Sequence, residues 1–198
     1  RFEATATGGI VVLKAVSDVI AESAFVSLVY ALVGSGLFLV VVYTVLKGRP
    51  SLGVVNLLPI AVTVAGIAAT MRFLNIPFNV LTGTILSIGL GLGVDYSAHL
   101  VHRFTEEYDG ENVFTALTAT VRGTGGALTG SMLTTVSGIG VLVVAITPIL
   151  GQFGLLTAVT VLYSYLASVI ALPPAFVVWA RVVNDDAVAL GADVETSE

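Results

Sequence analysis

The sequence predicts an all-α integral membrane protein, a bundle of five transmembrane helices preceded by a short amphipathic helix. Of the 198 residues, 56% are hydrophobic and 11% are charged, whereas soluble domains carry about 25% charged residues. Five apolar runs are each long enough to cross a bilayer as a helix. Most charges fall between these runs or at the ends of the chain, as in a multi-pass membrane protein.

Residues 1–24 are predicted to be the end of an extracellular domain. Over residues 10–24 apolar residues recur at helical spacing, while Lys14, Asp18 and Glu22 follow one another at i, i+4 intervals on another face. This pattern is typical of an amphipathic helix with a polar stripe in water. Because the chain does not begin at a methionine, we expect it to be part of a longer protein.

Residues 25–181 are predicted to form the transmembrane bundle, because turn-forming or basic residues separate five apolar segments. Between the third and fourth segments, an apolar stripe predicts a helix along the cytoplasmic surface over residues 111–121. An acidic cytoplasmic tail is expected over residues 182–198. The five predicted spans cover residues 25–46, 52–74, 80–101, 125–146 and 153–179.

Basic residues set the predicted orientation in the cell membrane. Five lie after the first span, after the third span or at the end of the fifth, whereas Arg72 lies on the opposite side. The positive-inside rule then places the N-terminus outside and the C-terminus in the cytoplasm. The five basic residues are Lys47, Arg49, Arg103, Arg122 and Arg181.

Asp95 is the residue on which the predicted function depends. It is the only acidic residue between Glu22 and Glu106 and falls inside the third span. A carboxylate there costs roughly 3 kcal/mol on insertion scales, and intramembrane ionisable groups usually mark functional pathways. We expect a proton or ion site, the alternative being a hydrogen bond that only locks the bundle.

The neighbours of Asp95 favour a proton relay. Tyr96 follows it, and His99 and His102 lie at i+4 and i+7, stepping toward the cytoplasm. A metal site on Asp95 and the two histidines would need a further ligand, so no metal is expected. If the third and fourth spans are antiparallel, hydroxyls at similar depth come from Ser131, Thr134 and Thr135.

Small residues predict how the third and fourth spans pack. Each span carries glycine, serine or threonine at i, i+4 intervals, and such ridges let transmembrane helices approach closely. A further glycine, Gly91, shares a face with Asp95, so we expect the third span to be a central helix buried on all sides. The ridge glycines are Gly89 and Gly93 in the third span, and Gly126, Gly130 and Gly138 in the fourth.

Enzymatic functions are not expected. The glycines at 89, 91 and 93 are spaced like a dinucleotide fingerprint but lie inside an apolar helix with no preceding strand. The glycine-rich segment 123–126 lacks the lysine of a phosphate-binding loop. No nucleophile has a plausible base, no cofactor is expected, and no basic surface indicates nucleic acid.

The third span closely resembles a known motif. Residues 91–107 read GLGVDYSAHLVHRFTEE and resemble the aspartate-containing helix of the resistance–nodulation–division (RND) superfamily. The Asp-Tyr pair is closest to the MMPL, hopanoid-exporter and Patched-like branch. Segments 75–79, 131–142, 148–154 and 172–175 are similar to other parts of that family, so the resemblance covers about residues 8–181.

The resemblance implies proton-driven, or alternatively sodium-driven, export of lipids or other hydrophobic molecules. It assigns the proton relay to Asp95 with Tyr96 as its partner, and a supporting role to the hydroxyls of the fourth span. Residues 1–24 would end an extracellular porter domain, and the five spans would be the second to sixth helices of one half. A second homologous half is therefore an expected partner, in the same chain or in a homo-oligomer, beside membrane lipids and the hydrophobic substrate.

Two other functions stay open at this point. The five-helix unit also resembles the sterol-sensing domain, which implies a lipid sensor that does not pump. SecD and SecF, accessory subunits of protein secretion, share the same helix plan. The Asp95-Tyr96 pair favours transport, because a pure sensor needs no intramembrane acid.

Overall fold

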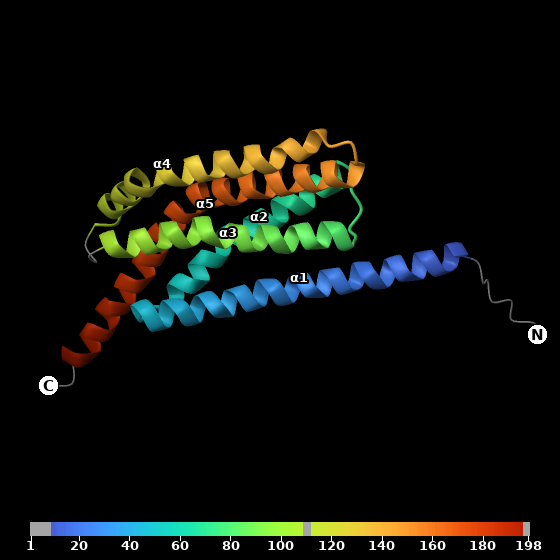
Figure 1. Cartoon of the computed structure of the whole chain (residues 1–198). Coiled ribbons are helices and arrows are strands. Elements are labelled where there is room, and N and C mark those ends of the chain that lie inside the picture. Colours follow the sequence, from blue (N-terminus) through green and yellow to red (C-terminus); the bar gives the residue numbers. More distant parts are fainter. Residues whose placement is uncertain (1–8, 109–111, 196–198) are drawn as a thin grey trace, which may run out of the picture.

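The computed structural model describes residues 9–108 and 112–195, and it confirms an all-α membrane bundle (Figure 1). Five helices each contain a stretch long and apolar enough to cross a membrane. The described helices are α1 (Gly9–Lys47), α2 (Pro50–Phe73), α3 (Val80–Glu107), α4 (Val113–Gly140), the 3₁₀ turn η1 (Val141–Val144) and α5 (Pro148–Glu195).

The amphipathic segment and the first span form one helix, not two. α1 is continuous over 39 residues, because no proline or glycine interrupts it between residues 10 and 33. At 1.5 Å per residue it is about 58 Å long, nearly twice the thickness of a bilayer core. Its N-terminal part extends away from the other helices (Figure 1). The predicted residues 1–8 lie outside the described part.

The separate surface helix predicted over residues 111–121 is corrected by the structure. Residues 113–121 are the first turns of α4, which runs on without a break into the fourth span. Glycines at 123, 125 and 126 do not end it, since helices in membranes tolerate glycine. Only part of the apolar stripe packs inward: Val113 and Leu117 pack on the core beside the buried Ala116, whereas Phe114 and Val121 are exposed.

α5 is the central helix of the bundle. It contacts α2, α3 and α4 and lies among them in Figure 1. Pro173 and Pro174 lie inside the helix, which continues past the predicted end of the fifth span into the region predicted as an acidic tail. Residues 196–198 of that tail are outside the described part.

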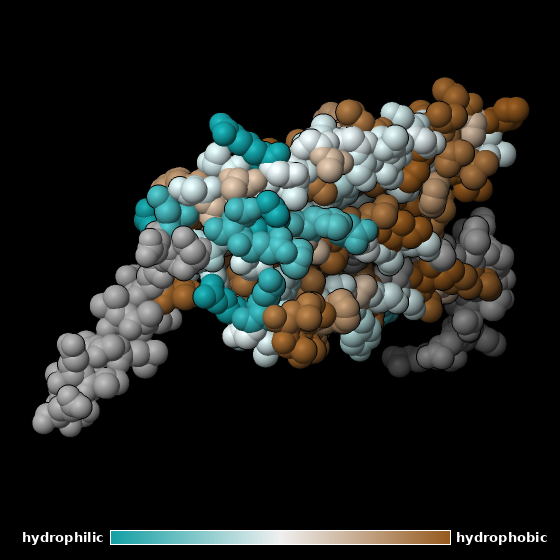
Figure 2. Space-filling model, turned by 60° about the vertical axis from the view of Figure 1, so that its left-hand side comes forward, coloured by the Kyte–Doolittle hydropathy of each residue, from teal (hydrophilic) through white to brown (hydrophobic). Residues whose placement is uncertain are grey.

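Aromatic side chains lock one end of the bundle, the end that carries Lys47 and Arg49 and is called the basic end below. Phe104 of α3 stacks on Phe176 of α5 with ring centroids 4.1 Å apart. The Trp179 indole N–H of α5 donates to the Ser51 hydroxyl of α2 (2.8 Å). A stacked aromatic pair adds about 0.5–1.5 kcal/mol beyond the area it buries. Together the stacking and the hydrogen bond connect α2, α3 and α5 at this end. Hydrophilic side chains gather on this end, whereas apolar ones cover the flanks (Figure 2).

The glycines of α3 lie directly against α5. A methyl group at Gly89 would overlap the Thr160 side chain, and one at Gly93 would overlap the Ser164 hydroxyl. Thr160 and Ser164 are both buried. The small-residue ridge of α3 therefore sets the distance between these two helices.

The ridge of α4 differs from this prediction. A methyl group at Gly126, Gly130 or Gly138 would meet no neighbour within 4 Å in the described structure. On α3, Asp95 and Gly91 are likewise exposed. The expectation that α3 is buried on all sides is thus wrong for this unit: one side packs on α5, and another side is open.

Candidate functional site

The start of α3 is fixed by a reciprocal cap. The Asn79 side-chain oxygen accepts a hydrogen bond from the Thr82 backbone N–H (3.0 Å), and the Thr82 hydroxyl accepts one from the Asn79 backbone N–H (2.7 Å). This capping box satisfies two backbone donors that the helix leaves unpaired. With this start, Asp95 falls about 22 Å along the helix, close to the midpoint of its 28 residues.

Asp95 lies in a cavity of about 370 Å³ between α3 and α4. Most of the residues predicted for the site line it together: Asp95, Tyr96, His99, Ser131 and Thr135. Leu92, Thr124, Ala127 and Leu128 complete the lining. The antiparallel arrangement of α3 and α4 thus brings acid, imidazole and hydroxyls to one depth.

Thr134 is the predicted residue that does not line the cavity. Its hydroxyl is exposed and donates to the Gly130 carbonyl within α4 (2.6 Å). The Thr135 hydroxyl donates to the Ser131 carbonyl (2.9 Å). Because that proton is engaged, the Thr135 oxygen offers the cavity an acceptor, which suits a protonated carboxyl.

Asp95 and Tyr96 point to different sides of α3. The carboxyl side is exposed, whereas Tyr96 is buried with 6% of its surface accessible. The Tyr96 ring meets the Tyr165 ring of α5 edge to face, with centroids 6.0 Å apart and planes at 79°. The site therefore has an open side with the acid and a packed side with two tyrosines.

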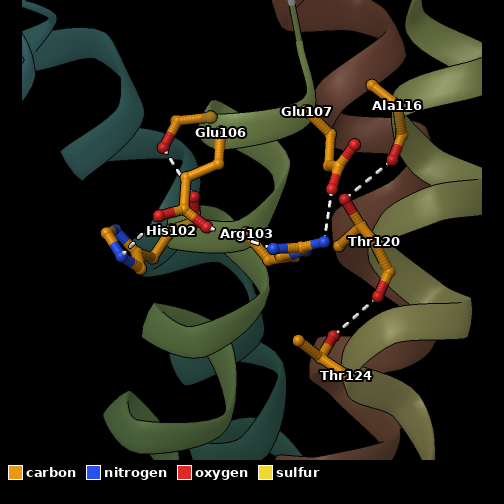
Figure 3. A network of polar contacts seen from close by, with 8 residues as sticks. His102, Arg103, Glu106, Glu107, Ala116, Thr120 and Thr124 are labelled. Atoms are coloured by element: carbon orange, nitrogen blue, oxygen red, sulfur yellow. Dashed lines mark hydrogen bonds and ion pairs between the residues drawn. The ribbon is translucent and has the colours of Figure 1, made fainter.

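A charged network lies on α3 toward the basic end (Figure 3). His102 Nε2 is 3.4 Å from Glu106 Oε1, and Arg103 Nη1 is 3.5 Å from Glu106 Oε2. Arg103 also forms a closer ion pair with Glu107. The guanidinium passes beside Gly123 of α4, where an added methyl group would lie in ordinary van der Waals contact with it.

Comparison with known proteins identifies the chain at this point. The family model described as the MMPL family matches residues 2–183, which is most of the chain. The chain belongs to the MMPL family. This assignment confirms the resemblance carried by the Asp95-Tyr96 motif. It also suggests a membrane transporter-like role for the chain.

A relative of this MMPL chain is a membrane protein of Methanocaldococcus jannaschii. The two are 30% identical over 180 residues, which are 90% of this chain and 45% of that protein. The MMPL chain thus spans about half the length of the curated relative that it matches.

The sequence did not reveal a hydroxyl pair, Tyr165 and Thr129, that does not line the Asp95 cavity but whose tyrosine ring packs on Tyr96. Tyr165 of α5 places its hydroxyl 2.7 Å from the Thr129 hydroxyl of α4, and the Thr129 hydroxyl is 2.7 Å from the Gly125 carbonyl, to which it donates. Tyr165 is therefore the donor to Thr129. The available signal was a tyrosine inside an apolar span, because a buried tyrosine hydroxyl usually needs a partner.

The described residues hold no group of three or more histidine, cysteine, aspartate or glutamate side chains placed to bind a metal. Asp95 and His99 share the cavity, but His102 does not line it and pairs with Glu106 instead. The arrangement consists of one acid, one imidazole and neutral hydroxyls. Groups of this kind can exchange protons and form hydrogen bonds.

Proposed function

We propose that this chain is part of a proton-driven exporter of lipids or other hydrophobic molecules, with Asp95 as the proton carrier. The observation that supports it most is the cavity that Asp95, Tyr96 and His99 line together with Ser131 and Thr135. It lies halfway along a helix long and apolar enough to span a membrane. Its described lining contains no lysine or arginine to neutralise the acid.

The cavity provides partners for both protonation states. A protonated Asp95 donates to the Thr135 oxygen, whose own proton is engaged with the Ser131 carbonyl. A deprotonated Asp95 accepts from a hydroxyl that can rotate, such as that of Ser131. Since each state prefers a different arrangement of α3 against its surroundings, proton binding shifts the balance between conformations.

The open side of the site requires a partner within the membrane. An exposed carboxylate at this depth is costly in contact with lipid, and the glycine ridge of α4 beside it suits close approach of another helix. The relative has more sequence outside the match than inside it. We propose that a second homologous half, in the same chain or in another copy, covers this face.

The proposed orientation places the basic end in the cytoplasm and the N-terminus of α1 outside. Lys47 and Arg49 lie where α1 passes into α2, and Arg103 and Arg122 flank the α3–α4 connection. Positive charges of short loops stay preferentially in the cytoplasm. Asp95 would then exchange protons between the outside and the cytoplasm through α3.

The test is Asp95→Asn in the full-length protein reconstituted in vesicles. Asparagine keeps the shape of the side chain and removes the titratable proton, so the variant should fold and insert but lose all export driven by a proton gradient. If the variant loses only the export that is driven by a sodium gradient, Asp95 would still be the coupling site, but the coupled ion would be sodium. Export at the rate of the parent would exclude the proposed mechanism.

Lipid sensing without pumping is the second candidate, and a separate cavity supports it. This cavity of about 650 Å³ lies between α2 and α5 and is lined mainly by apolar side chains such as Val62, Leu166 and Ile170. Thr70 and Tyr163 contribute polar groups to its lining, and their hydroxyls are hydrogen-bonded to each other (3.0 Å). A sensor would bind lipid equally well with Asp95 or asparagine and would show no gradient-driven flux.

A further inference from the structure

We propose that the pair His102–Glu106 is the site where the Asp95 relay exchanges its proton with water at the basic end. This inference rests on the proposed function and adds two residues to it. Asp95, His99, His102 and Glu106 follow one another at i, i+4, i+7 and i+11. At 100° per residue they fall within about 60° of arc on one helix face, and all four are exposed in the bundle.

The geometry of the pair is set by two partners on one carboxylate. Glu106 Oε2 faces Arg103 at 3.5 Å, and Glu106 Oε1 faces His102 Nε2 at 3.4 Å (Figure 3). Arg103 thereby holds the carboxylate with its other oxygen toward the imidazole. The imidazole nitrogen thus lies next to a carboxylate oxygen, the geometry in which a proton can pass between the two side chains.

Among the residues that the structure describes, the ion pairs of His102 and Glu106 come from α3 itself. Glu106 takes its ion pairs from His102 and Arg103, and Arg103 also binds Glu107. Other helices bring cations to the same end: Lys47 of α1, Arg49 before α2, Arg122 of α4 and Arg181 of α5. Of these, the Arg49 guanidinium lies over the Trp179 ring, 5.5 Å from its centroid. A proton on His102 therefore faces a carboxylate directly.

The step transfers one proton and no electrons. The O–H bond of the Asp95 carboxyl breaks as an N–H bond forms on His99, with water carrying the proton across one helical turn where needed. An N–H bond of His99 then breaks as an N–H bond forms on His102, and an N–H bond of His102 breaks as an O–H bond forms on the Glu106 carboxylate or on a water molecule. The distance from Asp95 to Glu106 along the axis is about 16 Å, about half the thickness of a bilayer core.

Glu107 provides a matched control for Glu106. Both are glutamates paired with Arg103, but Glu107 lies about 100° further round the helix and off the face of Asp95. In full-length protein in vesicles, Glu106→Gln and His102→Gln should each slow proton-driven export about tenfold, a modest part of the 10²–10⁴-fold effect typical of a positioned acid or base. Glu107→Gln should export at nearly the parent rate.

Four readouts separate proton exchange from a structural role. His102→Gln and Glu106→Gln should change the dependence of export on pH at the basic end and leave the KM for lipid unchanged. Glu106→Asp, which keeps a titratable group, should restore much of the rate. Melting temperatures in detergent identify a variant that fails to fold, and His102→Gln then decides the question.

The outcomes distinguish this inference from the proposed function. Full export by Asp95→Asn would refute both. Loss of export in Asp95→Asn, together with parent-like rates and pH profiles in His102→Gln and Glu106→Gln, would overturn the exchange site alone. An equal loss in Glu107→Gln and Glu106→Gln would also overturn it, because the effect would then belong to Arg103.

Discussion

The Tyr165 hydroxyl of α5 lies 2.7 Å from the Thr129 hydroxyl of α4. The same tyrosine meets the Tyr96 ring of α3 with its own ring. Three helices are therefore joined one residue away from Asp95. The orientation of Tyr96 depends on a side chain that the proposed relay does not itself use.

The first prediction concerns this hydroxyl pair. Tyr165→Phe should lower the free energy of unfolding by about 1 kcal/mol, the usual net value of one hydrogen bond. Thr129→Val should cost a similar amount. The double variant should cost little more than Thr129→Val alone, because Thr129→Val already removes the bond that Tyr165→Phe removes. Melting of the four proteins in detergent measures this, and strictly additive losses would contradict the pairing.

The second prediction compares two glycines. Gly93→Val should destabilise the protein by about 1–3 kcal/mol through overpacking, because a side chain there overlaps Ser164 of α5. Gly130→Val has open space around it within this unit. Thermal melting in full-length protein should therefore show, for Gly93→Val, a loss that arises within this unit and does not depend on a second half.

Gly130→Leu gives the complementary result. If a second half covers the open face of α3 and α4, this larger side chain should weaken the association of the halves and lower the melting temperature of the complete protein. A complete protein with Gly130→Leu that melts like the parent would show that α4 faces lipid at that position.

The third prediction tests the orientation with two prolines. Pro50 at the start of α2 and Pro77 before α3 are both exposed, at opposite ends of the bundle. They are better sites than Gly48 and Asn75, whose φ angles of 65° and 54° disfavour a cysteine. A membrane-impermeant thiol reagent should label Pro50→Cys from the cytoplasm and Pro77→Cys from outside. The reverse labelling would overturn the orientation.

The fourth prediction concerns His99. It lines the cavity beside Asp95, so His99→Ala should slow proton-driven export about tenfold or more and shift its pH optimum. His99→Gln, which keeps a hydrogen-bonding side chain, separates the loss of the titrating group from the loss of packing. An unchanged pH profile in both variants would make His99 structural.

Much of the fold could be predicted because transmembrane helices are encoded locally. Apolar length gives the spans, and the Asp95-Tyr96 motif indicated the family that the comparison confirms. The depth of Ser131 and Thr135 followed from counting residues along antiparallel helices. These two hydroxyls do lie around the cavity with Asp95.

The remainder depends on how helices are rotated about their axes. The pairing of Thr129 with Tyr165 joins residues 36 positions apart, and no local pattern specifies that rotation. The glycine ridges of α3 and α4 look alike in sequence, yet one meets α5 and the other meets nothing in this unit. Small residues indicate that a face can be approached closely, but they do not identify the partner.

The continuity of α1 has a mechanical consequence. Its membrane part packs on α2 and α3, whereas Val11, Val16 and Val19 near the other end are exposed. A stiff rod of this length acts as a lever: tilting it by about 5° around the Lys47 end moves the Gly9 end by about 5 Å, given its length of about 58 Å. If the proposed proton transfer at Asp95 shifts α3, the continuous helix α1 would convert that small shift into a larger movement on the far side of the bundle.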